Sequence, residues 1–159
     1  MKLAALPTPA ALVDGPRMLA NIQRMQARIS QLGARLRPHV KTAKCIEVAR
    51  AQMQAGAVGI TVSTLKEAEQ FFAAGFDDIL YAVCIVPHKL AQALALVLRG
   101  CKLTVLVDSL AAAQAVVTQG HAAGVALRAM IEIDTDGHHA AGRDRGARRG
   151  LRLPRPGHV

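Results

Sequence analysis

Aromatic side chains are nearly missing from this chain. It has no tryptophan, and aromatic residues make up only 3% of its 159 residues. Hydrophobic residues nevertheless make up 52%, so a sizeable core can form, and it must be built from aliphatic side chains. No run has the length and apolarity of a membrane span, and we expect no membrane partner. The N-terminal stretch contains Pro7, Pro9 and Asp14 and makes a poor signal peptide.

Cysteine is scarce, and the common nucleotide-binding motifs are missing. Cys45, Cys84 and Cys101 are odd in number and have no C-x-x-C spacing, which favours free thiols in a reducing cytosol over disulfides or zinc ligands. Cys84 lies in the apolar run "YAVCIV" and is interpreted as a small buried residue rather than a nucleophile. Neither G-x-G-x-x-G nor a P-loop occurs, so neither fingerprint supports a doubly wound nucleotide-binding sheet.

Acidic residues are few, and the net charge is +9. The excess is uneven, because residues 138–159 carry +5 and the preceding 137 residues carry only +4. The body therefore needs no polyanionic partner. A basic nucleic-acid-binding protein remains an alternative, and it predicts salt-sensitive binding that depends on the arginine-rich tail at 139–159.

Short apolar runs alternate with helical stretches along the rest of the chain. The runs are 36–41, 58–63, 79–83, 103–108 and 126–134, and the expected helices are 16–32, 44–55, 64–74, 87–98 and 109–123. Glycines stand where helices should end, and Thr64 with Glu67 fits a capping box. Strands that alternate with helices predict an α/β fold with a parallel sheet.

The regular repeat is typical of a (β/α)8 TIM barrel, of which about five βα units are visible whereas a closed barrel needs eight. We therefore interpret residues 1–138 as a truncated barrel domain with exposed strand edges and apolar surface. Residues 139–159 form an irregular Arg/Gly/Pro-rich tail, for which the hypotheses are disorder or translation out of frame.

The first run contains the candidate catalytic residue. In "RPHVKTAK" (37–44) a strand would place Arg37, His39 and Lys41 on one face, with Lys41 at its C-terminal end. That end is the functional mouth of a barrel, where a partly desolvated amine can attack an aldehyde and form a Schiff base. The alternative, an ordinary solvated lysine at a strand end, stays open on spacing alone.

A second candidate is "IEIDTDG" (131–137), in which Glu132, Asp134 and Asp136 share one strand face. These acids could hold a cation, orient a base or pair with a cofactor nitrogen. Equally, they could form a polar strand exit that caps a following helix.

Four stretches together resemble a known family. They are "TPAALVD" (8–14), "RPHVKTAK" (37–44), "GAVGITVSTLKEAEQFFAAGFDDIL" (56–80) and "IEIDTDGH" (131–138). In this order they are similar to D-threonine aldolase and D-serine dehydratase-like proteins. These are fold-type III pyridoxal phosphate enzymes with an alanine-racemase-like N-terminal barrel.

The resemblance implies a PLP-dependent lyase and a site. Lys41 would form the Schiff base with pyridoxal 5′-phosphate and act as a base at the substrate carbon, while His39 and Arg37 would lie on the cofactor side. The substrates would be D-configured β-hydroxy amino acids, cleaved to glycine and an aldehyde or dehydrated to an oxo acid and ammonia. The intact protein would use a divalent metal and form a homodimer. An amino-acid racemase and a non-catalytic PLP-binding protein remain alternatives.

The chain also departs from the family pattern. Ala43 replaces a histidine that family members carry, and Arg143 comes too late for the arginine that contacts the cofactor's phenolic oxygen. The last barrel strands and the C-terminal domain, which supply the metal ligands, are not recognisable. We therefore expect no metal ligand within this chain, which on this reading is an inactive fragment of the intact enzyme.

Overall fold

The computed structural model describes residues 5–133, in which helices and strands alternate. The elements are α1 (Gly15–Gln31), α2 (Ile46–Gln54), β1 (Ile60–Val62), α3 (Leu65–Ala73), β2 (Asp78–Cys84), the 3-10 turn η2 (Pro87–Lys89), α4 (Leu90–Leu98), β3 (Lys102–Val107), α5 (Leu110–Ala122) and β4 (Arg128–Ile131). The predicted helices are confirmed to within two residues at nearly every end. No helix of the described part is long and apolar enough to cross a membrane.

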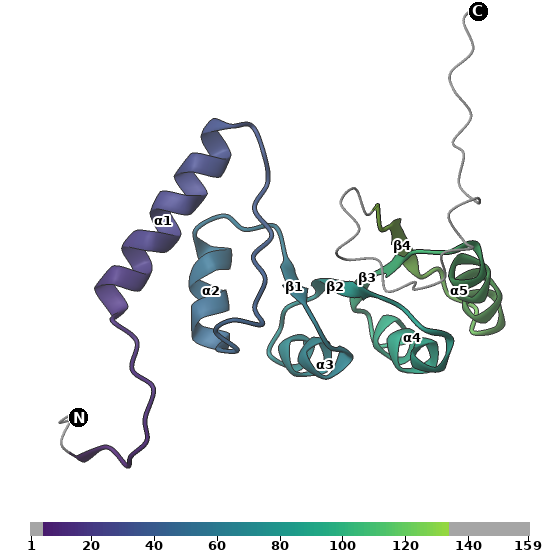
Figure 1. Ribbon diagram of the computed structural model, residues 1–159, viewed down its shortest axis with the longest axis horizontal. Helices are drawn as coiled ribbons and strands as arrows, with labels where there is room; N and C mark the ends of the chain where they lie inside the picture. The colour runs from purple at the N-terminus through teal and green to yellow at the C-terminus, as the bar shows by residue number, and fades with distance from the viewer. Residues whose placement is uncertain (1–4, 134–159) are drawn as a thin grey trace, which may run out of the picture.

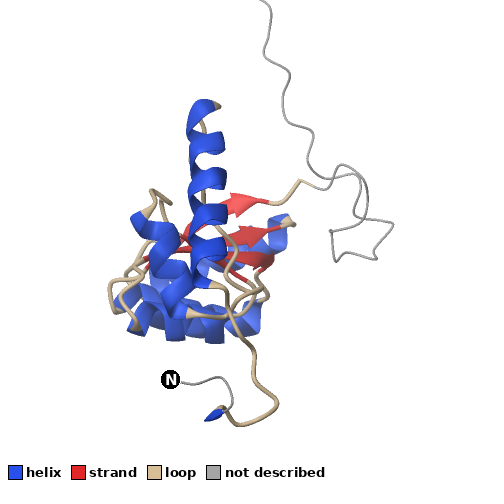
Figure 2. Ribbon diagram, turned by 90° about the vertical axis from the view of Figure 1, so that its left-hand side faces the viewer, coloured by secondary structure: helices blue, strands red, loops and turns tan. Residues whose placement is uncertain are grey.

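The four strands form one parallel sheet in the order β1-β2-β3-β4. Helices α3, α4 and α5 lie on the same side of this sheet (Figure 1), and a view turned by 90° shows the strands above a layer of helices (Figure 2). A doubly wound sheet would instead reverse its strand order and carry helices on both faces. Sequential order with helices on one face is the winding of a (β/α)8 barrel, so the predicted partial barrel is confirmed.

The first predicted strand is only partly formed. Residues 36–40 run beside β1 and make a single bridge, His39 to Thr61. Val40 N–H donates to Thr61 O at 2.9 Å, and Thr61 N–H donates to Pro38 O at 2.8 Å. Pro38 has no N–H with which to continue a ladder, and the chain turns directly after the bridge. The expected strand at 36–41 is therefore an edge segment that ends before Lys41.

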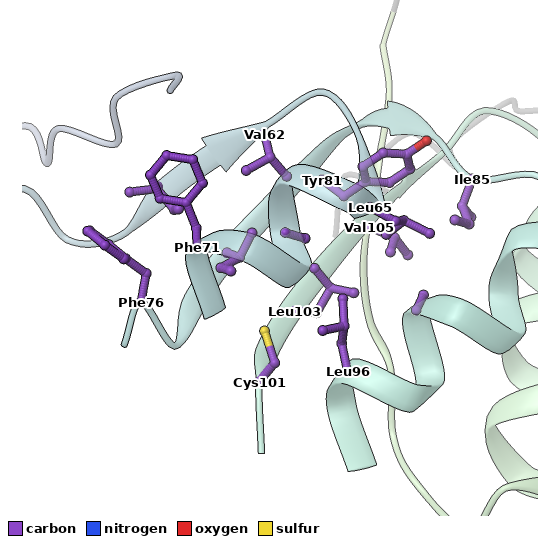
Figure 3. Packing of buried hydrophobic residues seen from close by; sticks show 14 of the residues in the cluster. Val62, Leu65, Phe71, Phe76, Tyr81, Ile85, Leu96, Cys101, Leu103 and Val105 are labelled. Carbon is purple, nitrogen blue, oxygen red and sulfur yellow. The ribbon is translucent and has the colours of Figure 1, made fainter. Parts of the chain in front are cut away.

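The core lies between the sheet and the helices and is mainly aliphatic. In β1, β2 and β3, the side chains on one face of the strand are buried. They are Ile60 and Val62 in β1, Ile79 and Tyr81 in β2, and Leu103, Val105 and Val107 in β3. Figure 3 shows several of these side chains packed against α3 and α4. Phe71 and Phe76 meet edge to face with ring centroids 5.4 Å apart. The aliphatic core expected from composition is confirmed.

The local signals for helix ends also work as expected. Asp14, which was not predicted as a cap, also caps α1 by accepting from Arg17 N–H at 3.0 Å. Thr64 and Glu67 form the predicted capping box of α3. After α3, Gly75 has a φ of +95°, a left-handed conformation that costs glycine little. All three cysteines are free.

The sheet of the described residues is open rather than closed into a barrel. Its last strand, β4, is exposed along its whole length, and the apolar side chains of Met130 and Ile131 are 55% and 58% exposed. The expected exposure of apolar strand surface is therefore confirmed at this edge.

Candidate active site

The carboxyl ends of the parallel strands meet at one edge of the sheet, called here the C-terminal edge. The residues that reach it are Ser63 after β1, Cys84 at the end of β2, Asp108 after β3 and Glu132 after β4. The turn that carries Lys41 adjoins this edge, because His39 pairs with Thr61 near the end of β1. The predicted position of Lys41, at the mouth of the barrel, agrees with this placement.

Lys41 lies in a tight turn, called here the lysine turn (residues 40–44). Val40 is only 3% exposed and anchors the turn in the core, while Lys41 itself is exposed. Lys44 N–H donates to Val40 O at 2.8 Å, and Lys44 has a φ of +46°, which is uncommon for a residue other than glycine. The partial desolvation expected for Lys41 is not found, because the turn lifts it out of the strand.

His39 is half-buried and connects the lysine turn to β1. Its Nδ1 accepts from Lys41 N–H at 3.3 Å, and its Nε2 lies 3.3 Å from Ser63 Oγ. Because Nδ1 is an acceptor, the neutral ring carries its proton on Nε2 and donates it to Ser63. Burial and the nearby Lys41 ammonium lower the pKa of His39 from its usual value, and the Glu67 carboxylate opposes them. The lowered pKa favours the neutral ring.

Glu67 is a buried acid in the first turn of α3, and it faces the lysine turn. Its Oε2 accepts from Ser63 N–H at 2.9 Å and from Thr64 N–H at 3.3 Å, and its Oε1 lies 3.5 Å from Lys44 Nζ. Burial alone would raise the pKa of the Glu67 carboxyl, but the Ser63 hydrogen bond and the Lys44 ammonium outweigh it and lower this pKa. Sequence reasoning predicted the helix cap and missed the contact with Lys44.

Arg37 lies at the opposite, N-terminal edge of the sheet. Its Nη1 is 3.0 Å from Asp78 Oδ1 and donates to Asp78 O at 3.2 Å and to Ile60 O at 3.4 Å. Ile60 and Asp78 are the first residues of β1 and β2, and the guanidinium passes over Gly59, where a Cβ would collide with it. The structure therefore brings His39 and Lys41 together and separates Arg37 from both.

The acids expected near β4 are only partly described. Glu132 is half-buried, and its N–H donates to Val107 O at 2.9 Å, whereas Asp134 and Asp136 lie outside the described residues. Burial, with Asp108 and Glu132 nearby, raises the pKa of the Cys84 thiol to about 11. A thiol with this pKa is protonated at neutral pH, which agrees with the interpretation that Cys84 is not a nucleophile. Within residues 5–133, no group of three or more His, Cys, Asp or Glu side chains is placed to hold a metal ion.

Fold and site together define a class of protein. The singly wound parallel βα sheet is the first part of a βα barrel, and the lysine turn at its C-terminal edge places an amine at the mouth of that barrel. The sequence matches the family described as "Alanine racemase, N-terminal domain" over residues 13–153. The match covers most of the chain, and the chain belongs to this family.

Individual relatives support the same assignment. The D-threo-3-hydroxyaspartate dehydratase of Delftia sp. (strain HT23) is 62% identical over 138 residues, which are 87% of this chain and 36% of the relative. Its solved structure superimposes with a TM-score of 0.83 over 88% of this chain and 37% of that one. The D-threonine aldolase of Filomicrobium marinum matches with a TM-score of 0.79 at 32% identity, over 86% of this chain and 37% of that one. The chain thus spans about a third of the length of these relatives.

Proposed function

We propose that this chain is the lysine-bearing part of a pyridoxal phosphate-dependent lyase that acts on D-configured β-hydroxy amino acids. The observation that carries the proposal is the exposed Lys41 at the C-terminal edge, in a chain 62% identical to a D-threo-3-hydroxyaspartate dehydratase. Dehydration is favoured over retro-aldol cleavage, because the aldolase relative is only 32% identical over a similar share of the chain. Formation of a homodimer stays a prediction.

The described residues fit an aldehyde cofactor, because the lysine turn offers one free primary amine. Lys44 Nζ is engaged by Glu67, whereas the Lys41 amine makes no ion pair within residues 5–133. Lys41 would hold pyridoxal 5′-phosphate through Nζ, with the neutral His39 ring beside it. When bound, this cofactor supplies an electron sink for negative charge that develops at the substrate Cα.

The remaining chemistry falls to the chain's own side chains. Lys41 Nζ, once the substrate amine has displaced it from the cofactor and it is neutral, would accept the proton of the substrate Cα and so act as the general base. His39 keeps the lysine turn in place, because its Nδ1 accepts the Lys41 backbone N–H while Ser63 holds its Nε2. Within residues 5–133, no cluster of side chains suits the divalent metal that the resemblance implies.

The experiment that tests the proposal is reductive trapping. The purified chain is mixed with pyridoxal 5′-phosphate, reduced with borohydride and mapped by peptide mass spectrometry, with circular dichroism as the control for folding. We expect the pyridoxyl group on Lys41, its loss in Lys41→Ala, and its persistence in the matched variant Lys66→Gln. A folded chain without selective labelling of Lys41 would contradict the proposal.

A second measurement separates the two reactions in a protein that carries the whole fold. Dehydration of a D-3-hydroxy amino acid releases an oxo acid and ammonia, whereas retro-aldol cleavage releases glycine and an aldehyde. Release of ammonia from D-threo-3-hydroxyaspartate without glycine would support the dehydratase. Glycine as the main product would favour the aldolase.

A further inference from the structure

Two lysines, Lys41 and Lys44, lie three residues apart in the same exposed turn, and an aldehyde would react with either amine. The structure treats them differently. Lys44 Nζ lies 3.5 Å from Glu67 Oε1, and the Glu67 side chain is only 9% exposed. A carboxylate that is nearly buried attracts a partner more strongly than an exposed one does. The ion pair therefore engages the amine of Lys44, whereas the Lys41 amine makes no ion pair within residues 5–133.

Glu67 also acts on the turn from its other oxygen. Oε2 accepts from the backbone N–H groups of Ser63 and Thr64, which fixes the position of Ser63. Ser63 Oγ in turn meets His39 Nε2, and His39 Nδ1 accepts the N–H of Lys41. Both branches from the Glu67 carboxylate thus end in the lysine turn, one at each end.

The conformation of Lys44 shows that this turn needs support. A φ of +46° is strained for a residue with a Cβ, and such strain persists only where surrounding contacts hold it. The contacts present are the backbone bond from Lys44 N–H to Val40 O and the ion pair with Glu67. Of these two, only the ion pair connects the Lys44 side chain to α3.

We propose that Glu67 is a positioning residue that fixes the lysine turn and engages Lys44, so that Lys41 is the amine left for the cofactor. The inference rests on the proposed function, because it presupposes that Lys41 is the amine that reacts. The inference gives Glu67 a second role, because capping of α3 alone does not explain its contact with Lys44.

The central variant is Glu67→Gln. Glutamine serves in a capping box as glutamate does, so the start of α3 is kept, but the attraction for Lys44 is lost. We expect the amide protection factors of Lys41 and Lys44, measured by hydrogen exchange and NMR, to fall about threefold, a typical effect of losing a partly exposed ion pair. Amides within α3 should stay unchanged. The matched control is Lys66→Gln, which removes another ion pair of the same helix and should leave the turn unaffected.

Reductive trapping supplies a second readout that a purely structural role would not move. In Glu67→Gln, we expect pyridoxyl labelling to spread from Lys41 to Lys44, because the amine of Lys44 is released. Lys44→Gln should loosen the turn as Glu67→Gln does, and the double variant should loosen it no further, because both changes remove one contact. If Glu67→Gln does not fold, Lys44→Gln still tests the contact with the cap intact.

The outcomes separate this inference from the proposed function. Unchanged protection at Lys41 and Lys44 in the Glu67→Gln and Lys44→Gln variants, or an equal loss throughout α3, would overturn the role of Glu67. Absence of labelling at Lys41 in the parent chain would instead contradict the proposed function, and the protection factors would still decide whether Glu67 fixes the turn.

Discussion

Arg37 provides the sharpest test of the site, because the sequence resemblance and the structure assign it different roles. The resemblance places it beside the cofactor, whereas its guanidinium binds Asp78 and two backbone carbonyls at the N-terminal edge of the sheet. The informative change is Arg37→Met, which keeps an apolar stem of similar length and removes the charged head. We expect lower stability and unchanged labelling of Lys41.

The size of the stability loss follows from the exposure of the pair. The side chains of Arg37 and Asp78 are 27% and 30% exposed, so the pair is neither a surface ion pair nor a buried one. Hydrogen bonds to charged groups contribute roughly 1.5–3 kcal/mol when well buried, and exposed ion pairs contribute up to about 1 kcal/mol. Arg128, 3.7 Å from the same Asp78 oxygen, keeps a positive charge near the carboxylate. We therefore expect a loss of about 2 kcal/mol in the free energy of unfolding.

The assay is urea unfolding followed by circular dichroism, in which about 2 kcal/mol lowers the midpoint by roughly 1 M for a domain of this size. Arg37→Lys is the matched control, because it keeps the charge, loses the planar fork and should fall between parent and Met variant. Reductive trapping is then repeated without urea. A loss below about 0.5 kcal/mol together with weaker labelling of Lys41 would refute the structural role and restore the cofactor role.

Two further predictions concern single residues. Gly59→Ala should lower the free energy of unfolding by about 2 kcal/mol in the same urea assay. The reason is that the new Cβ would lie 2.7 Å from Asp78 O and collide with Arg37. An unchanged free energy of unfolding would mean that the backbone shifts freely there. His39, whose pKa is lowered below the usual 6.5, binds its proton less readily in the folded than in the unfolded chain. Its contribution to stability is therefore present above pH 6.5 and falls as the pH drops below it. An NMR titration would check the direction of the pKa shift. The pH dependence of the free energy of unfolding should be weaker in a His39→Gln variant and unchanged in the control His121→Gln.

The sequence predicted most of the fold because local rules decide it. Apolar periodicity located the helices, and the Thr64–Glu67 pair marked the start of α3 within one residue. The strand at 36–41 was overestimated: the apolar run indicated a full strand, whereas Pro38 cannot donate a ladder hydrogen bond and marks an edge segment. Element type therefore followed from the sequence, whereas the extent of pairing depended on the neighbouring strand.

The site was only half predictable for a geometric reason. The alternation of side chains correctly separates the faces of a strand, but residues that share one face can still lie at opposite edges of the sheet. Arg37 and Lys41 are four residues apart, which is roughly 13 Å of extended chain, more than the length of β1. The ion pair between Lys44 and Glu67 could not be predicted either, because it depends on a left-handed lysine that no sequence pattern marks.

The same short segment thus serves both edges of the sheet. Its beginning, Arg37, ties the N-terminal ends of β1 and β2 together, and its end carries the lysine turn at the opposite edge. Between them, the buried Val40 and its backbone bond to Thr61 hold the segment against β1. Because this buried middle separates the two ends, stability can be provided at one edge while the other keeps an exposed, strained turn. A partly formed strand is suited to this division, since a continued ladder would pair Lys41 with Ser63 at the sheet edge instead of leaving it in an exposed turn.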